Sequence, residues 1–255
     1  MITPMGRFAS FDGIGIDYEV RGEGAPVVLL HGFAADTRLN WEAPGIVDAL
    51  LSSGRQVVTT DARGHGRSDR PHEPEAYAAG AMARDVSCLL DELGLAHVDL
   101  VGYSMGSMTA MQVSALDKRV RSAVLGGVGG AMLRPTIDRQ AIAEALVDAD
   151  ARSAAPTARA FRRFADASGA DLEALAAIQR ARRPPPPDLS SLAVPVLVIA
   201  GDEDALAGPP EGLALAIPGA RAAIIKGNHL SAVRDPDFPR LIVAFLDQVE
   251  EGRLA

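Results

Sequence analysis

The chain has 255 residues, 48% hydrophobic and 23% charged, and these proportions exclude a disordered or fibrous protein. Its formal net charge of −8 disfavours nucleic acid and anionic membrane surfaces as partners. The single cysteine, Cys88, excludes an intramolecular disulfide. No apolar run has the length of a membrane span, and residues 1–11 lack the apolar core of a signal peptide, so we expect a cytoplasmic protein.

The first segment of the chain predicts a sheet that begins antiparallel. Two alternating stretches, 7–11 and 14–20, are separated by Asp12-Gly13, which is a strong hairpin signal. The continuous apolar run at 27–30 is typical of a strand that is covered on both faces.

Helices and strands then alternate along the chain, as expected for a parallel sheet with helices on its faces. We expect a helix at 41–51, a strand at 56–60, a helix at 77–93, and strands at 98–101 and 120–125.

A long segment without strand signals interrupts this alternation. Residues 134–183 predict two or three helices rich in Ala and Arg, and the proline run at 184–187 ends them. We interpret 134–187 as a helical lid inserted into a core formed by 1–133 and 188–255. The alternation resumes with strands at 194–199 and 222–225 and closes with an amphipathic helix at 238–249.

The pentapeptide at 102–106, Gly-Tyr-Ser-Met-Gly, is the most informative motif. It joins a predicted strand to a predicted helix, so Ser104 stands at the apex of a sharp turn. Gly102 and Gly106 remove the Cβ atoms that would collide with the strand and the helix. The N–H of Met105 is left free at a helix N-terminus, where it suits a developing oxyanion. The motif predicts a nucleophile and half of an oxyanion hole.

A serine nucleophile needs a base, and His229 is the histidine placed for that role. It follows the last predicted strand, so it lies at the same carboxyl edge of the sheet as Ser104. Asp202, Glu203 and Asp204 follow the preceding strand and offer three carboxylates to orient the imidazole. The residues alone do not select one of the three.

The turn after the strand at 27–30 can supply the second oxyanion donor. We expect this donor to be the N–H of Phe33, because Gly32 lets the backbone bend toward a substrate. We interpret His31 as a side chain that braces this loop, and the charged, glycine-bent segment 61–68 as structural.

The order of these motifs along the chain resembles that of the α/β-hydrolase fold superfamily, in its compact esterase, lactonase and haloperoxidase-like branch. The resemblance covers nearly the whole chain and implies a mostly parallel eight-stranded sheet flanked by helices. In that family the acid is usually the third residue after the glycine, here Asp204, whereas Asp202 is commonly present without a catalytic role. Its haloalkane dehalogenases and epoxide hydrolases carry aspartate at the elbow, where this chain has Ser104. The matching pieces are 31–33, 61–68, 102–106, 201–204 and 227–229.

The resemblance and the residue chemistry predict a serine hydrolase that cleaves a small or medium carboxylic ester, thioester or lactone through an acyl-enzyme. The alternatives are a carbon–carbon bond hydrolase or cofactor-free perhydrolase with the same triad, and a small-molecule receptor that retains the triad. The histidines lack metal-ligand spacing, so we expect no metal and no cofactor.

The substrate pocket is expected to be apolar. Its predicted wall, beside Phe33 and Met105, consists of loop residues near the carboxyl edge of the sheet: Trp41, Met132, Leu133, Leu206 and Leu230. In the lid, Arg159, Arg162 and Arg163 recur at helical spacing and are a hypothetical site for a substrate carboxylate.

Overall fold

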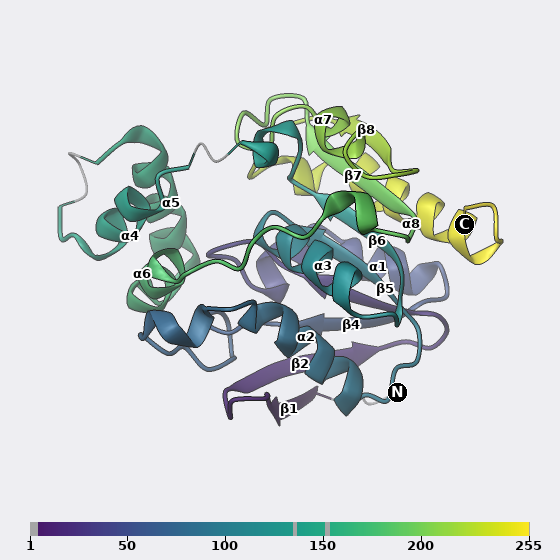
Figure 1. Ribbon diagram of the computed structural model, residues 1–255, viewed down its shortest axis with the longest axis horizontal. Coiled ribbons are helices and arrows are strands. Elements are labelled where there is room, and N and C mark those ends of the chain that lie inside the picture. Colours follow the sequence, from purple (N-terminus) through teal and green to yellow (C-terminus); the bar gives the residue numbers. More distant parts are fainter. Residues whose placement is uncertain (1–4, 135–136, 151–153, 255) are drawn as a thin grey trace.

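The computed structural model describes residues 5–134, 137–150 and 154–254, and eight strands in this part form one sheet (Figure 1). The strand order is β1-β2-β4-β3-β5-β6-β7-β8. The strands are β1 (Met5–Ala9), β2 (Gly15–Arg21), β3 (Pro26–Leu30), β4 (Gln56–Thr60), β5 (Val98–Tyr103), β6 (Val120–Gly126), β7 (Val196–Gly201) and β8 (Arg221–Ile225).

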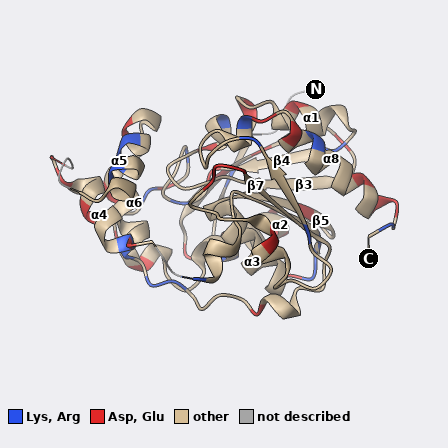
Figure 2. Cartoon of the chain, turned by 90° about the horizontal axis from the view of Figure 1, so that it is seen from above, with Lys and Arg blue, Asp and Glu red and all other residues tan. Residues whose placement is uncertain are grey.

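The sheet is mostly parallel, as the sequence predicts. Strand β2 runs antiparallel to both of its neighbours, and the strands from β4 to β8 pair in parallel. Figure 2 shows β3, β4 and β7 without charged residues. Strands covered on both faces read as continuous apolar runs, which explains why these were recognisable from the sequence.

Two layers of helices cover the faces of the sheet. They are α1 (Ile46–Ser52), α2 (Ala81–Glu92), α3 (Met105–Leu116), α7 (Pro210–Ala214) and α8 (Asp237–Glu250). Successive strand residues face opposite sides. In β3, Val28 joins the apolar cluster of α2, α3 and α7, whereas Val27 joins that of α1 and α8. The buried sheet between these layers holds the strand ends in fixed positions.

Two predicted helices begin later than expected. The segment expected at 41–51 is divided into a π-helical turn at Arg38–Glu42 and α1, because Gly45 between them is left-handed at φ 79°. The helix expected from residue 77 begins at Ala81, after Gly80 at φ 75°. A short 3-10 turn, Pro74–Tyr77, precedes it. Glycine adopts this conformation without the steric cost that a Cβ would impose, so it marks these boundaries.

Between β6 and β7, the described residues form three α-helices, which stand at the left of Figure 1: α4 (Arg139–Val147), α5 (Pro156–Ser168) and α6 (Leu172–Arg180). We call residues 139–180 the helical insertion. Helix α4 packs on both α5 and α6, and α6 packs on the turn Pro74–Tyr77. Within the predicted lid, 135–136 and 151–153 lie outside the described residues. No helix in the described part of the chain is long and apolar enough to cross a bilayer.

Candidate active site

Ser104 occupies a strained turn between β5 and α3. Its backbone lies at φ 52° and ψ −109°, a conformation that residues other than glycine rarely adopt. The turn is possible because its flanking glycines lack side chains: a Cβ at Gly106 would lie 1.8 Å from the carbonyl oxygen of Leu30. The N–H of Ser104 donates to the carbonyl of Gly126 at 2.8 Å, which ties the turn to β6. This geometry holds the hydroxyl clear of the sheet.

The structure brings Ser104, His229 and Asp204 together. The Nε2 atom of His229 lies 2.9 Å from the Oγ of Ser104, and its Nδ1 lies 2.8 Å from the Oδ2 of Asp204. With the carboxylate accepting from Nδ1–H, Nε2 is free to accept the serine proton. Tyr103 donates its hydroxyl proton to the carbonyl of His229 at 2.8 Å and so fixes the histidine loop to the end of β5.

The three carboxylates after β7 occupy different surroundings. Asp204 is buried, and its Oδ1 accepts the backbone N–H groups of Leu206 at 3.1 Å and Ala207 at 2.9 Å. Asp202 instead accepts from Lys226, whose ammonium group, with the N–H of Gly227, lowers the pKa of that carboxyl. Glu203 is exposed. Of these three carboxylates, Asp204 is the one that contacts the imidazole of His229.

The turn that carries Phe33 passes beside Ser104. A Cβ at Gly32 would lie 3.6 Å from the Cβ of Ser104. The side chain of Asn40 accepts the N–H of Gly32 at 2.9 Å, whereas its own Nδ2 has no partner within the described residues. The N–H groups of Phe33 and Met105 likewise make no hydrogen bond in that part of the chain. Both are therefore available to an oxyanion.

Two buried histidines hold this turn, and the sequence pointed to only one of them. His31 Nε2 accepts the N–H of Ala62 at 3.0 Å, so its Nδ1 donates to the carbonyl of Gly32 at 2.8 Å. His65 Nε2 accepts the N–H of Ala34 at 3.1 Å. Burial and the neighbouring His31 lower the pKa of His65 to about 3, so its ring remains neutral. Both rings brace the loop, as we expected for His31.

The segment 61–68 is anchored by a buried charge network, which accords with its predicted structural role. Arg63 is fully buried and donates to Asp85 through Nε and Nη2, each at 2.6 Å, and to Asp12 at 2.8 Å. Burial lowers the pKa of this guanidinium, but the hydrogen bonds to Asp85 and Asp12 outweigh burial and raise it. The loop is thereby joined to the first hairpin and to α2.

Two cavities meet at Ser104 and His229. The Arg139 cavity lies between the helical insertion and α2 and α3, and the Asn40 cavity extends along α5 toward Leu230. Phe33 and Phe161 line both, with their rings edge to face at 5.7 Å. Ser104 is thus accessible from two sides.

The predicted pocket wall agrees with the structure only in part. Leu206 lines both cavities, Met132 lines the Arg139 cavity and Leu230 lines the Asn40 cavity. The expectation for Trp41 is wrong: its side chain is fully buried in the apolar cluster beneath α1. Leu133 is about half exposed and is absent from the described residues that line these cavities, so that expectation is also wrong.

The arginines of the cavity were not anticipated. Arg139 and Arg183 line the Arg139 cavity. Arg162, one of the arginines proposed from helical spacing, instead donates to the carbonyls of Ala145 at 3.0 Å and Asp148 at 2.6 Å and so caps α4. The only sequence signal for Arg183 is its position just before the proline run.

Comparisons with known proteins agree with this fold. The α/β-hydrolase fold family model matches residues 25–141. An sn-1-specific diacylglycerol lipase of Mus musculus is 46% identical over 86 residues, which cover 33% of this chain and 26% of that protein. The segments matched in this and the next two curated relatives cover 26% to 40% of their lengths.

Solved structures match over almost the whole chain. The enol-lactonase of Burkholderia xenovorans LB400 is 27% identical with a TM-score of 0.74, over 95% of this chain and 100% of that one. A thermophilic esterase of Thermogutta terrifontis is 25% identical with a TM-score of 0.75, over 96% and 99%. The chain belongs to the α/β-hydrolase fold superfamily and is similar to its esterase and lactonase members.

Proposed function

We propose that the chain is a serine hydrolase that cleaves a small or medium carboxylic ester, thioester or lactone through an acyl-enzyme. The observation that carries the proposal is the continuous contact from Asp204 through His229 to Ser104. A buried carboxylate, a neutral imidazole and a hydroxyl in this arrangement activate a serine toward a carbonyl carbon. The similarity to an enol-lactonase and an esterase supports the same substrate class.

In the first half of the reaction, the Oγ of Ser104 attacks the carbonyl carbon while its proton moves to Nε2 of His229. The N–H groups of Phe33 and Met105 stabilise the oxyanion that forms, and Asp204 stabilises the imidazolium. Collapse of the intermediate expels the alcohol or thiol, which takes the proton from His229.

In the second half, water attacks the acyl group on Ser104 and gives its proton to His229. The carboxylic acid then leaves as Ser104 recovers that proton, so the enzyme returns to its starting protonation state. No cofactor is required for either half. We propose that the helical insertion acts as a lid over these steps, with Phe161 on α5 as its contact to Phe33.

The test combines turnover with active-site labelling. The purified chain is assayed with p-nitrophenyl acetate and butanoate and labelled with a fluorophosphonate, followed by mass spectrometry. We expect hydrolysis and a single adduct on Ser104, both lost in Ser104→Ala and both retained in Cys88→Ala, which controls for the free thiol. Labelling without turnover of any ester would favour a receptor.

The carbon–carbon and perhydrolase alternatives are separated by their products. The chain is incubated with a β-diketone, and separately with acetate and hydrogen peroxide, and the products are compared with those from the esters. We expect ester cleavage to exceed both other reactions. Faster cleavage of the diketone, or faster peracid formation, would overturn the assignment of substrate class while leaving Ser104 as the nucleophile.

A further inference from the structure

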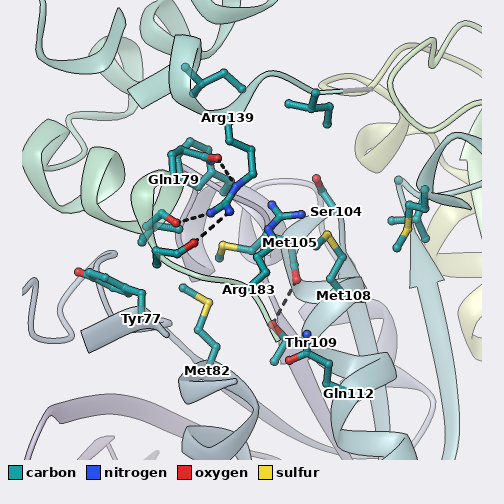
Figure 3. A pocket seen from close by; sticks show the side chains of 18 of the residues that line it. Tyr77, Met82, Ser104, Met105, Met108, Thr109, Gln112, Arg139, Gln179 and Arg183 are labelled. Carbon is teal, nitrogen blue, oxygen red and sulfur yellow. Dashed lines mark hydrogen bonds between the residues drawn. The ribbon is translucent and has the colours of Figure 1, made fainter. Parts of the chain in front are cut away.

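The Arg139 cavity is lined mainly by apolar side chains and by two arginines, Arg139 and Arg183. Figure 3 shows Arg139 and Arg183 directed into the cavity, with Gln112 and Gln179 nearby. Met105 and Met108 supply apolar side chains to the same cavity. An apolar pocket with a few polar groups in fixed places is typical of a site that orients a small ligand.

No acidic side chain balances these two arginines in the cavity. Its described lining residues include neither Asp nor Glu, although the chain carries a net charge of −8. Within the described residues, Arg183 forms neither a hydrogen bond nor an ion pair. Arg183 is exposed, so water solvates its charge in the empty cavity, and no acidic group among the described lining residues competes with a ligand for the two guanidinium groups.

Arg139 is held in a fixed orientation. It donates to Gln179 at 3.2 Å and to the carbonyls of Ala181 at 3.0 Å and Ile178 at 2.6 Å, at the end of α6. These contacts use three of its five N–H donors and leave two. Burial and the neighbouring Arg183 lower the pKa of Arg139 to about 10, so it remains charged at neutral pH. Two positive charges therefore face the same space, and an anion between them would relieve their repulsion.

We propose that the Arg139 cavity binds a carboxylate on the part of the substrate remote from the scissile bond, with Arg183 and the free N–H groups of Arg139 as donors. The inference rests on the proposed function, and it narrows the substrate to a carboxylic ester or lactone that carries a second, ionised carboxyl group. Guanidinium groups match a planar carboxylate with paired hydrogen bonds. The apolar wall then accommodates the carbon chain between the two ends.

The kinetic test compares charged and neutral substrates of equal size. The charged set consists of the ethyl half-esters of succinic, glutaric and adipic acid, and each is paired with the ester whose free carboxyl is a carboxamide. In a second pair of substrates, 2-carboxyethyl butanoate and 2-carbamoylethyl butanoate, the carboxylate or carboxamide stands on the alcohol part of the ester instead of the acyl part. We expect at least one carboxylate to exceed its carboxamide in kcat/KM by about tenfold, mainly through KM.

Two variants then test whether Arg183 is responsible for the preference for the carboxylate substrate. Arg183→Gln is expected to reduce the ratio of kcat/KM between carboxylate and carboxamide to near unity, because it removes the charge that distinguishes the two substrates. Arg182→Gln removes the same charge one residue away, from an exposed position outside the cavity lining, and should preserve the preference. Absence of any carboxylate preference in the wild type, or an equal effect of both variants, would overturn the proposal.

A binding measurement separates this inference from the proposed function. Glutarate and glutaramate are titrated calorimetrically into Ser104→Ala, and into the same variant with Arg183→Gln. Binding of glutarate that requires Arg183 supports the anion site even if no ester is turned over, in which case the proposed function fails alone. Equal binding of glutarate with and without Arg183 rejects the anion site, even if esters are hydrolysed.

Discussion

The two sides of the candidate active site are built differently. The nucleophile, acid and histidine lie on turns that follow β5, β7 and β8, between two layers of core helices. The helical insertion on the other side has a small core in which alanine predominates. Its buried alanines are Ala143, Ala145, Ala158, Ala165, Ala174, Ala176 and Ala177.

This difference has an energetic consequence. Alanine buries far less apolar area than the valine, leucine and isoleucine of the sheet, so each contact in the insertion contributes less to stability. Phe33, Ala34 and Tyr77 are the buried core-side residues in that cluster. We infer that the reacting groups are held rigidly by the core, whereas the groups that select the substrate belong to a side that opens at lower cost.

The largest effect on activity is expected for a substitution on the rigid side of the site, by which we mean the turns after β5, β7 and β8. Asp204→Asn leaves the size of the side chain unchanged but removes the charge that orients and stabilises His229, so kcat should fall by roughly 10⁴-fold. Asp202→Asn is the matched control, because Asp202 contacts Lys226 and Gly227 rather than the imidazole. We expect its kcat to remain within about tenfold of wild type. Steady-state kinetics on a p-nitrophenyl ester measure kcat for both variants. Equal losses of kcat in the two variants would reject Asp204 as the acid.

The second prediction concerns the stability of the core. Arg63→Met should lower the free energy of unfolding by about 3–5 kcal/mol, because it leaves Asp85 buried without its partner. Arg240→Met breaks an exposed pair with Asp237 and should cost less than about 1 kcal/mol. Urea unfolding followed by circular dichroism measures both. Similar midpoints for the two variants would show that the network does not stabilise the core.

The third prediction is a pH dependence at the oxyanion turn. The pKa of His65 is lowered from its ordinary 6.5 to about 3, so below pH 6.5 the unfolded chain binds a proton that the folded chain does not. Its contribution to stability is therefore lost as pH falls from about 6.5 toward 3. Between pH 7 and pH 5 we expect the stability advantage of wild type over His65→Gln to shrink by on the order of 1–2 kcal/mol.

The control for this pH effect is the exposed His97. His97→Gln removes an imidazole from a solvated position, and its stability difference from wild type over the same pH range is the baseline for the His65→Gln difference. Denaturant midpoints at four or five pH values provide the comparison. A His65→Gln difference that stays constant over this range would mean that folding does not lower the pKa of His65.

Much of the rigid side could be predicted from the sequence, because its signals are local. The glycines around Ser104 report the steric demand of one turn, and continuous apolar runs report strands covered on both faces. The order of the acid and His229 along the chain follows from parallel strands, which bring successive strand ends to one edge. The sequence could not distinguish Asp202 from Asp204, since that choice depends on which carboxylate faces His229 across a different loop.

The pocket and the insertion were harder to predict because they depend on tertiary contacts. Trp41 lies on a segment near the site, yet its ring turns into the core. Arg162 has the spacing of a solvated or binding residue, yet it caps a neighbouring helix. Arg139 and Arg183 are far apart in sequence and meet only when α4 and the segment after α6 close the cavity.

The smallest expected effect tests the insertion itself. Arg162 donates to the last carbonyls of α4 and pairs with Asp166 at 2.9 Å, so Arg162→Gln removes both the cap and the favourable charge at that helix end. We expect a loss of about 1 kcal/mol confined to the insertion. Amide hydrogen exchange should show faster exchange in α4 and unchanged protection in β5 and β6. Arg163→Gln, at an exposed position on the same helix, is the control and should leave both unchanged.

This last experiment decides whether the two sides are thermodynamically separate. If the insertion opens by itself, a local loss in α4 lowers the free energy of its opening without changing that of the sheet. The Arg139 cavity would then also be open more often, and KM for substrates bound there should rise while kcat, set by the rigid side, stays constant. If instead β5 and β6 lose protection by the same amount as α4, the insertion and the sheet unfold as one unit, and the inferred difference between the two sides is wrong.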